Sequence, residues 1–168
     1  MCVFRRLCLI PLAILLVPWA AIAQAQDLFV LNENDRTVRR YDGVTGAPKP
    51  SQGNTGAVFL DLLSQGYDAS DIAFGPDGNL YITDTRDFRV LRYDVGQGTI
   101  GIFTPTNSRL NYAENLRFGP DGNLYVSSNA VIGPDSFYNG IFRFNGSTGA
   151  SLPSAPADMG TTVGGGAR

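Results

Sequence analysis

Short apolar runs that alternate with polar positions recur along the chain after residue 25. The clearest are Leu28-Phe29-Val30, Leu80-Tyr81-Ile82 and Leu124-Tyr125-Val126, and turn-forming residues lie near each of them. Alternation with a period of two is typical of β-strands, because successive side chains point to opposite faces of a sheet. No segment keeps a helical period over the ~10 to 12 residues that a helix needs. The pattern therefore predicts an all-β protein.

An octapeptide, FGPDGNLY, occurs at residues 74–81 and again, 44 residues later, at 118–125. A repeat of this length is typical of proteins built from similar structural units. Within the octapeptide, proline fixes the first corner of a turn, aspartate tolerates the second, and glycine adopts the left-handed conformation that closes it. We interpret Asp77 and Asp121 as turn residues, because the spacing and distal glutamate of a calcium loop are missing. Each copy predicts a β-hairpin.

Alignment on the hairpins divides the chain into three units, each of short antiparallel strands. The second unit has four expected strands at 71–74, 80–84, 89–94 and 99–104, the third has them at 115–118, 123–127, 140–144 and 150–152, and the first has three at 28–31, 37–41 and 58–62. The first unit therefore lacks the innermost strand, and residues 131–139 of the third form an enlarged loop. Four-stranded antiparallel units of this length are typical of the blades of a β-propeller.

The order of apolar strand, FGPDGNLY, variable loop and Val90-Leu91-Arg92-Tyr93-Asp94 resembles the NHL-repeat propellers. It is also similar to the gluconolactonase and senescence-marker superfamily and to the streptogramin lyases. The resemblance covers about residues 27–152 and implies blades at 27–66, 67–110 and 111–152, followed by a low-complexity tail at 153–168. It implies either a binding or interaction module of the NHL type or a calcium-dependent, lactonase-like hydrolase. Streptogramin lyases rely on a catalytic histidine, which this chain lacks.

The related families usually close a ring of six blades, whereas this sequence contains three. Two outer faces would then stay open, so we expect either a fragment of a longer propeller or a homodimer that closes the ring. The apolar residues expected on these open faces are Leu28, Val30 and Val38 in the first unit and Leu124, Val126 and Ile141 in the third. The tyrosines at repeated positions are expected to pack between neighbouring blades; they are Tyr41, Tyr81, Tyr93 and Tyr125.

The first 25 residues have the pattern of a signal peptide. Arg5 and Arg6 precede an apolar run over 7–23, and small residues offer cleavage before Gln24 or Gln26. A retained anchor helix is the alternative, although the run is just short of the ~20 residues that a membrane span needs. The segment predicts a secreted protein, periplasmic or extracellular, with no stable membrane span after cleavage.

Cleavage would remove Cys2, Cys8 and the only tryptophan, and the chain contains no histidine. Zinc sites of cysteine and histidine, disulfides and histidine-activated nucleophiles are thereby excluded, and a metal would need oxygen ligands such as those of calcium. The processed chain would keep 11 basic and 15 acidic residues, with the basic ones scattered. Nucleic acid is therefore not an expected partner. The expected partner is a protein, peptide or glycan.

The candidate ligand-binding residues are Asp71, Glu114 and Asn115, which lie just before the innermost strands of the second and third units. The start of that strand faces the central channel of a propeller. In gluconolactonase-like proteins, to which the chain is similar, acidic and amide side chains in the channel hold a divalent cation that polarises a lactone carbonyl. Asp71 and Asn115 can instead bind backbone donors at the strand entry. We predict no catalytic residue and no cofactor, with calcium reserved for the hydrolase alternative.

Overall fold

The computed structural model describes residues 26–105, 110, 112–128 and 140–153, and all regular structure in them is β-strand. The strands are β1 (Leu28–Asn32), β2 (Thr37–Tyr41), β3 (Val58–Asp61), β4 (Ile72–Phe74), β5 (Leu80–Asp84), β6 (Arg89–Asp94), β7 (Thr99–Ile102), β8 (Ala113–Phe118), β9 (Leu124–Ser128), β10 (Gly140–Phe144) and β11 (Ser151–Leu152). Every expected strand is present. The expected signal peptide, enlarged loop and most of the tail lie outside the described residues.

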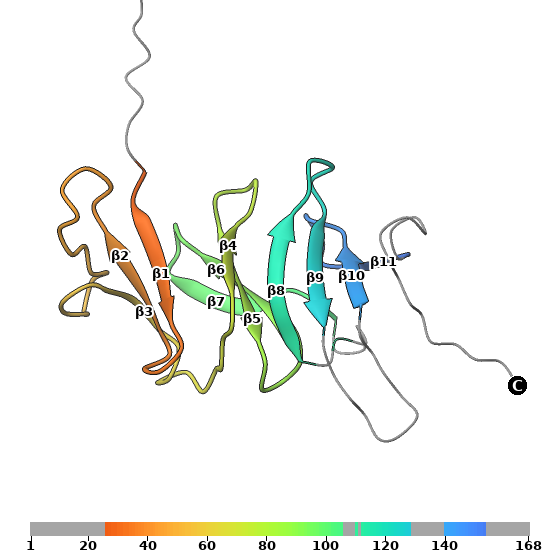
Figure 1. The fold of residues 1–168 in the computed structure, drawn as a ribbon, viewed down its shortest axis with the longest axis horizontal. Coiled ribbons are helices and arrows are strands. Elements are labelled where there is room, and N and C mark those ends of the chain that lie inside the picture. Colours follow the sequence, from red (N-terminus) through yellow and green to blue (C-terminus); the bar gives the residue numbers. More distant parts are fainter. Residues whose placement is uncertain (1–25, 106–109, 111, 129–139, 154–168) are drawn as a thin grey trace, which may run out of the picture.

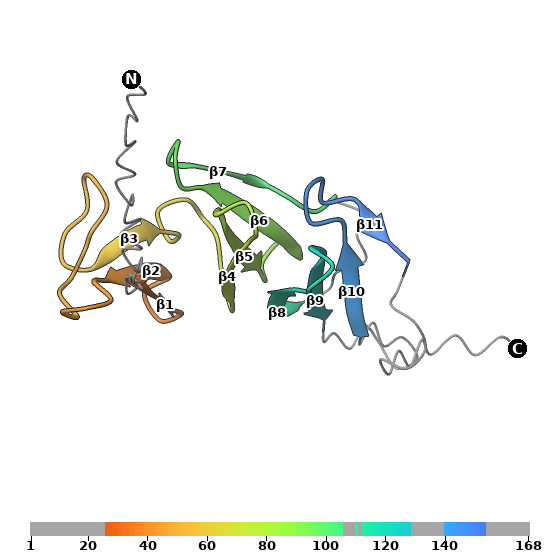
Figure 2. The same ribbon diagram turned by 90° about the horizontal axis from the view of Figure 1, so that it is seen from above.

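The strands form three antiparallel sheets, which follow one another along the chain (Figure 1). The first blade has the order β1-β2-β3, the second β4-β5-β6-β7, and the third β8-β9-β10-β11. Figure 2 shows β4 and β8 along one side of the row, and β3, β7 and β11 along the other. The predicted all-β array of blades is confirmed, and the described part of the first blade has three strands.

The FGPDGNLY hairpins have the geometry that their turn residues predict. In the second blade, the N–H of Gly75 donates to the carbonyl of Asn79 at 2.9 Å, and Gly78 has a φ of 76°. In the third, Gly119 donates to Asn123 at 2.9 Å, and the equivalent turn glycine has a φ of 73°. This left-handed conformation strains residues with a side chain, which explains the glycine.

Two apolar cores fill the spaces between the blades. Strand alternation directs Leu80 and Ile82 of β5 toward the first blade and Tyr81 toward the third, and all five residues of β5 are buried. The core between the first two blades includes Phe59 and Leu60, and that between the second and third includes Leu116. The second blade is therefore covered on both faces, whereas the first and third are each covered on one.

The exposed faces carry only part of the expected apolar rows. Leu28, Val30 and Ile141 are 58%, 39% and 39% exposed, as expected for open faces. The prediction was wrong for Val38, Leu124 and Val126, which are fully buried. Val38 is paired with Leu31 on the face of the first blade that packs against the second. Leu124 and Val126 lie on the face of the third blade that packs against the second.

The repeated tyrosines also divide between inner and outer faces. Tyr81 and Tyr93 are buried between blades, so the packing prediction is confirmed for them. It was wrong for Tyr41 and Tyr125, which lie half-buried on the outer faces of the first and third blades. These two tyrosines lie on faces that no described blade covers, because no described blade precedes the first or follows the third.

Candidate functional site

Asp71 lies directly before β4 and links the second blade to the third. Its backbone N–H donates to Oγ1 of Thr83 at 2.8 Å, and its carbonyl accepts from the N–H of Thr83 at 3.0 Å. One carboxylate oxygen accepts the N–H of Leu116 in β8 at 2.9 Å and lies 2.6 Å from the guanidinium of Arg117. The carboxylate thus binds a backbone donor of the neighbouring blade and is paired with a cation.

Glu114 and Asn115 lie in β8, the strand whose Leu116 binds the carboxylate of Asp71. The N–H of Asn115 donates to Oγ of Ser127 at 3.1 Å, which matches the contact between Asp71 and Thr83. Glu114 is half-buried, and its carbonyl accepts from the hydroxyl of Ser70 at 2.7 Å. The structure therefore brings the three candidate residues together where two inner strands begin. Their role in ligand binding stays a prediction.

Sequence reasoning missed the side chains that hold this group. Ser70, Thr83 and Arg117 supply the hydroxyls and the cation described above. The repeat offset could have found Thr83, since Ser127 stands 44 residues later with the same hydroxyl. It gave no signal for Arg117, because the equivalent residue of the second blade is Ala73.

The residues around Asp71 do not fit a calcium ion. Calcium takes about six to eight oxygen ligands, most of them carboxylate or carbonyl. The carboxylate oxygen of Asp71 is bound by a backbone N–H and by the guanidinium of Arg117, whose positive charge would repel a second cation. Among the residues that the structure describes, no three acidic, histidine or cysteine side chains are grouped as metal ligands would be.

Asp77 organises the hairpin of the second blade. Its carboxylate accepts hydrogen bonds from the side-chain amide of Asn79 at 2.8 Å, the hydroxyl of Tyr81 at 3.2 Å and the guanidinium of Arg92 at 3.0 Å. Burial acts to raise the pKa of Asp77, but the hydrogen bonds from Asn79, Arg92 and Tyr81 outweigh it and lower the pKa. The interpretation of Asp77 as a turn residue is thus confirmed.

Asp121 repeats the arrangement in the third blade. Its carboxylate accepts from the side-chain amide of Asn123 at 2.8 Å, the hydroxyl of Tyr125 at 2.9 Å and the guanidinium of Arg143 at 2.9 Å. The bonds from Asn123, with those from Tyr125 and Arg143, lower the pKa of Asp121 well below its usual range. The shared polar residues of the octapeptide therefore lock the hairpins.

We expect these carboxylates to make the protein sensitive to acid. A carboxyl whose folded-state pKa is lowered stabilises the fold above its unfolded pKa, and that contribution is lost as the pH falls through the folded value. Stability should therefore decline below about pH 4, since the pKa values of Asp77 and Asp121 lie below the ordinary 3.8. Urea unfolding across this range should show a shallower decline for Asp121→Asn than for the wild type. Parallel curves would contradict the assignment.

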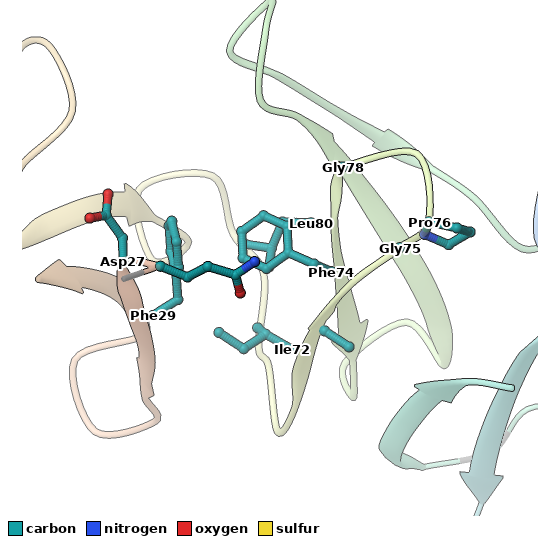
Figure 3. Close-up of a pocket in the computed structure, with 10 residues that line it drawn as sticks. Asp27, Phe29, Ile72, Phe74, Gly75, Pro76, Gly78 and Leu80 are labelled. Carbon is teal, nitrogen blue, oxygen red and sulfur yellow. The ribbon is translucent and has the colours of Figure 1, made fainter. Parts of the chain in front are cut away.

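A cleft of about 580 Å³ lies between β1 and β4 (Figure 3). The rings of Phe29 and Phe74 line it and contact each other edge to face, with centroids 4.7 Å apart. Asp27 lies at the same cleft and is paired with Lys49 at 2.8 Å. The cleft thus combines aromatic and aliphatic side chains with a carboxylate that is paired with a lysine. Sequence reasoning missed it as a site, because the cleft forms only where two blades meet.

No family model and no curated protein match the chain. Among solved structures, the fold is similar to that of hydrazine synthase from Kuenenia stuttgartiensis, which contains β-propeller domains. That likeness has a TM-score of 0.53 and 17% identity, over 77% of this chain and 32% of the other. A catalytically inactive virginiamycin B lyase from Staphylococcus aureus with quinupristin has a TM-score of 0.38 and 18% identity, over 72% and 41%.

The likeness to hydrazine synthase agrees with the topology of the described sheets. Three antiparallel sheets packed face to face, together with the likeness to hydrazine synthase, define an all-β fold of the β-propeller class with an incomplete ring. The chain spans 32% and 41% of the two similar proteins. Within the described residues, no helix is long and apolar enough to cross a membrane.

Proposed function

We propose that the chain is a secreted β-propeller module that binds a protein, peptide or glycan. The pattern of residues 1–25 supports export. The cleft between β1 and β4 carries the proposal of binding, because it combines the apolar side chains of Phe29, Ile72 and Phe74 with the polar groups of Gln26 and Asp27. Phe74 is 42% exposed at this cleft and can contact a ligand.

The repeated polar residues support binding over catalysis. The carboxylates of Asp77 and Asp121 are bound by the amide, hydroxyl and guanidinium groups of their own hairpins. The carboxylate of Asp71 is bound by Leu116 and Arg117 of the neighbouring blade. Each of these acids has a structural role, and such a role does not leave its charge available to activate water.

A substitution in the cleft tests the proposal. Purified protein would be applied to arrays of peptides and glycans, together with Phe74→Glu and the control Ile102→Glu. Ile102 is 54% exposed on the outer strand β7, so the control adds the same charge away from the cleft. We expect Phe74→Glu to weaken binding by about tenfold or more, because a bound ligand would bury the new charge. Equal binding by both variants, or no bound ligand, would contradict the proposal.

Calcium titration addresses the hydrolase alternative. Calorimetry with calcium chloride and an assay of lactone hydrolysis would be run on the wild type and on Asp71→Ala and Asn115→Ala. We expect no binding that depends on Asp71, since Arg117 occupies the position next to its carboxylate. Tight binding that Asp71→Ala abolishes, together with turnover, would favour the hydrolase.

A further inference from the structure

We infer that the edge of β1, together with the cleft beside it, accepts an extended strand from another polypeptide. The inference rests on the proposed binding function and names its ligand class. In the second and third blades, the strands equivalent to β1 are β5 and β9, and each is paired on both sides. In the described first blade, β1 pairs with β2 alone. Among the described residues, no strand lies beside β1 in the position that β4 and β8 occupy in the other two blades.

The backbone of β1 presents hydrogen-bonding groups to this edge. Backbone groups of successive residues in a strand face opposite sides, and Leu28 and Val30 face β2. The N–H and C=O of Phe29 and the N–H of Leu31 therefore face the open edge. Thr83, the equivalent of Leu31 in the second blade, donates its N–H to the carbonyl of Asp71 at 3.0 Å. An incoming antiparallel strand would form the same bonds with β1.

Side-chain pairing in the complete blades defines the apolar part of the ligand. Ile72 of β4 lies opposite Ile82, and Phe74 lies opposite Leu80. The third blade has the same pattern, with leucine and phenylalanine two residues apart in β8. Transferred to β1, an aliphatic residue would lie opposite Val30 and a phenylalanine opposite Leu28. These two residues are 39% and 58% exposed, and such a strand would cover them.

The contacts before the strand define its polar part. The carboxylate of Asp71 accepts the N–H of Leu116, and the hydroxyl of Ser70 donates to the carbonyl of Glu114 at 2.7 Å. At the contact between the first and second blades, the equivalent groups are the N–H of Ile72 and the carbonyl of Ser70, both in the second blade. A ligand with serine and aspartate before its aliphatic residue would bind both. The preferred ligand therefore has the pattern Ser-Asp-aliphatic-x-Phe-Gly, which residues 70–75 of this chain exemplify.

A synthetic peptide with the sequence of residues 68–77, DASDIAFGPD, is the probe. Added to the full chain, it should slow amide hydrogen exchange at Phe29 and Leu31 by about tenfold or more, because these amides gain strand partners. The same peptide with an N-methyl group on its central alanine lacks the donor to Phe29 and should bind about tenfold more weakly. Val30→Glu should weaken binding, whereas Ile141→Glu, equally exposed on the opposite outer face, should not.

Three outcomes would overturn the inference. They are equal binding by the N-methylated peptide, unchanged exchange at Phe29 and Leu31, and a dimer that protects these amides without peptide, which would make a second copy the occupant. The results also distinguish a failure of the strand inference from a failure of the proposed binding function. If the peptide does not bind but an array ligand is still lost in Phe74→Glu, only the strand inference fails. If neither binds, both fail.

Discussion

Replacing Tyr81 with alanine is expected to destabilise the protein by about 3 to 5 kcal/mol, as for other buried aromatic residues. Tyr81 is 1% exposed, and its ring packs edge-to-face against Phe103 and Phe118 with centroids 4.8 and 4.7 Å apart. Its hydroxyl donates to Asp77 at 3.2 Å. The substitution would leave a cavity between the second and third blades and remove one bond of the hairpin. Urea unfolding followed by circular dichroism measures the loss.

The repeat supplies a matched control for this substitution. Tyr125 is the equivalent residue of the third blade and makes the same bond, to Asp121, at 2.9 Å, but it is only half-buried. Tyr125→Ala should therefore cost about 1 kcal/mol, and Tyr81→Phe, which keeps the ring, should cost a similar amount. If Tyr81→Ala and Tyr125→Ala cost the same, the packing between the second and third blades would not be the source of the stability.

The sequence predicted the strands well because their signals are local. Proline, aspartate and glycine define each hairpin within four residues, and the repeat aligns the strands around them. It was harder to predict the face of the sheet to which each side chain points. Val38 and Leu28 are both apolar and belong to paired strands, but they point to opposite faces, and only the register of β1 with β2 distinguishes them.

The candidate site shows the same limit. The position of Asp71 at the entry of an inner strand followed from the repeat, and the structure places it there. Its partners, Leu116 and Arg117, are 45 and 46 residues away in the chain and meet it only because the second and third blades pack together. Such contacts depend on tertiary packing, for which a single sequence carries no local signal. The cleft between β1 and β4 depends on packing in the same way.

Gly75 should tolerate no side chain, although its backbone conformation is not left-handed. A Cβ atom at this position would lie 2.5 Å from Cε2 of Tyr81, 2.8 Å from Oδ1 of Asp77 and 3.1 Å from Cζ of Phe118. The ring of Tyr81 is held between blades and cannot move away without disturbing that core. We expect Gly75→Ala to destabilise the protein by about 2 to 3 kcal/mol, as overpacking does in cores.

Alanine variants of two further glycines distinguish the cost of side-chain crowding from the cost of backbone strain. Gly101 lies in β7, and a Cβ atom added to it would meet nothing within 4 Å, so Gly101→Ala should change the free energy of unfolding by less than about 1 kcal/mol. Gly78 is equally open but has a φ of 76°, so Gly78→Ala should cost about 1 kcal/mol through strain alone. Urea unfolding of the three variants should therefore rank Gly75→Ala first, Gly78→Ala second and Gly101→Ala last. A Gly75→Ala variant as stable as Gly101→Ala would show that the ring of Tyr81 can move, and that the contact between the second and third blades is looser than the structure indicates.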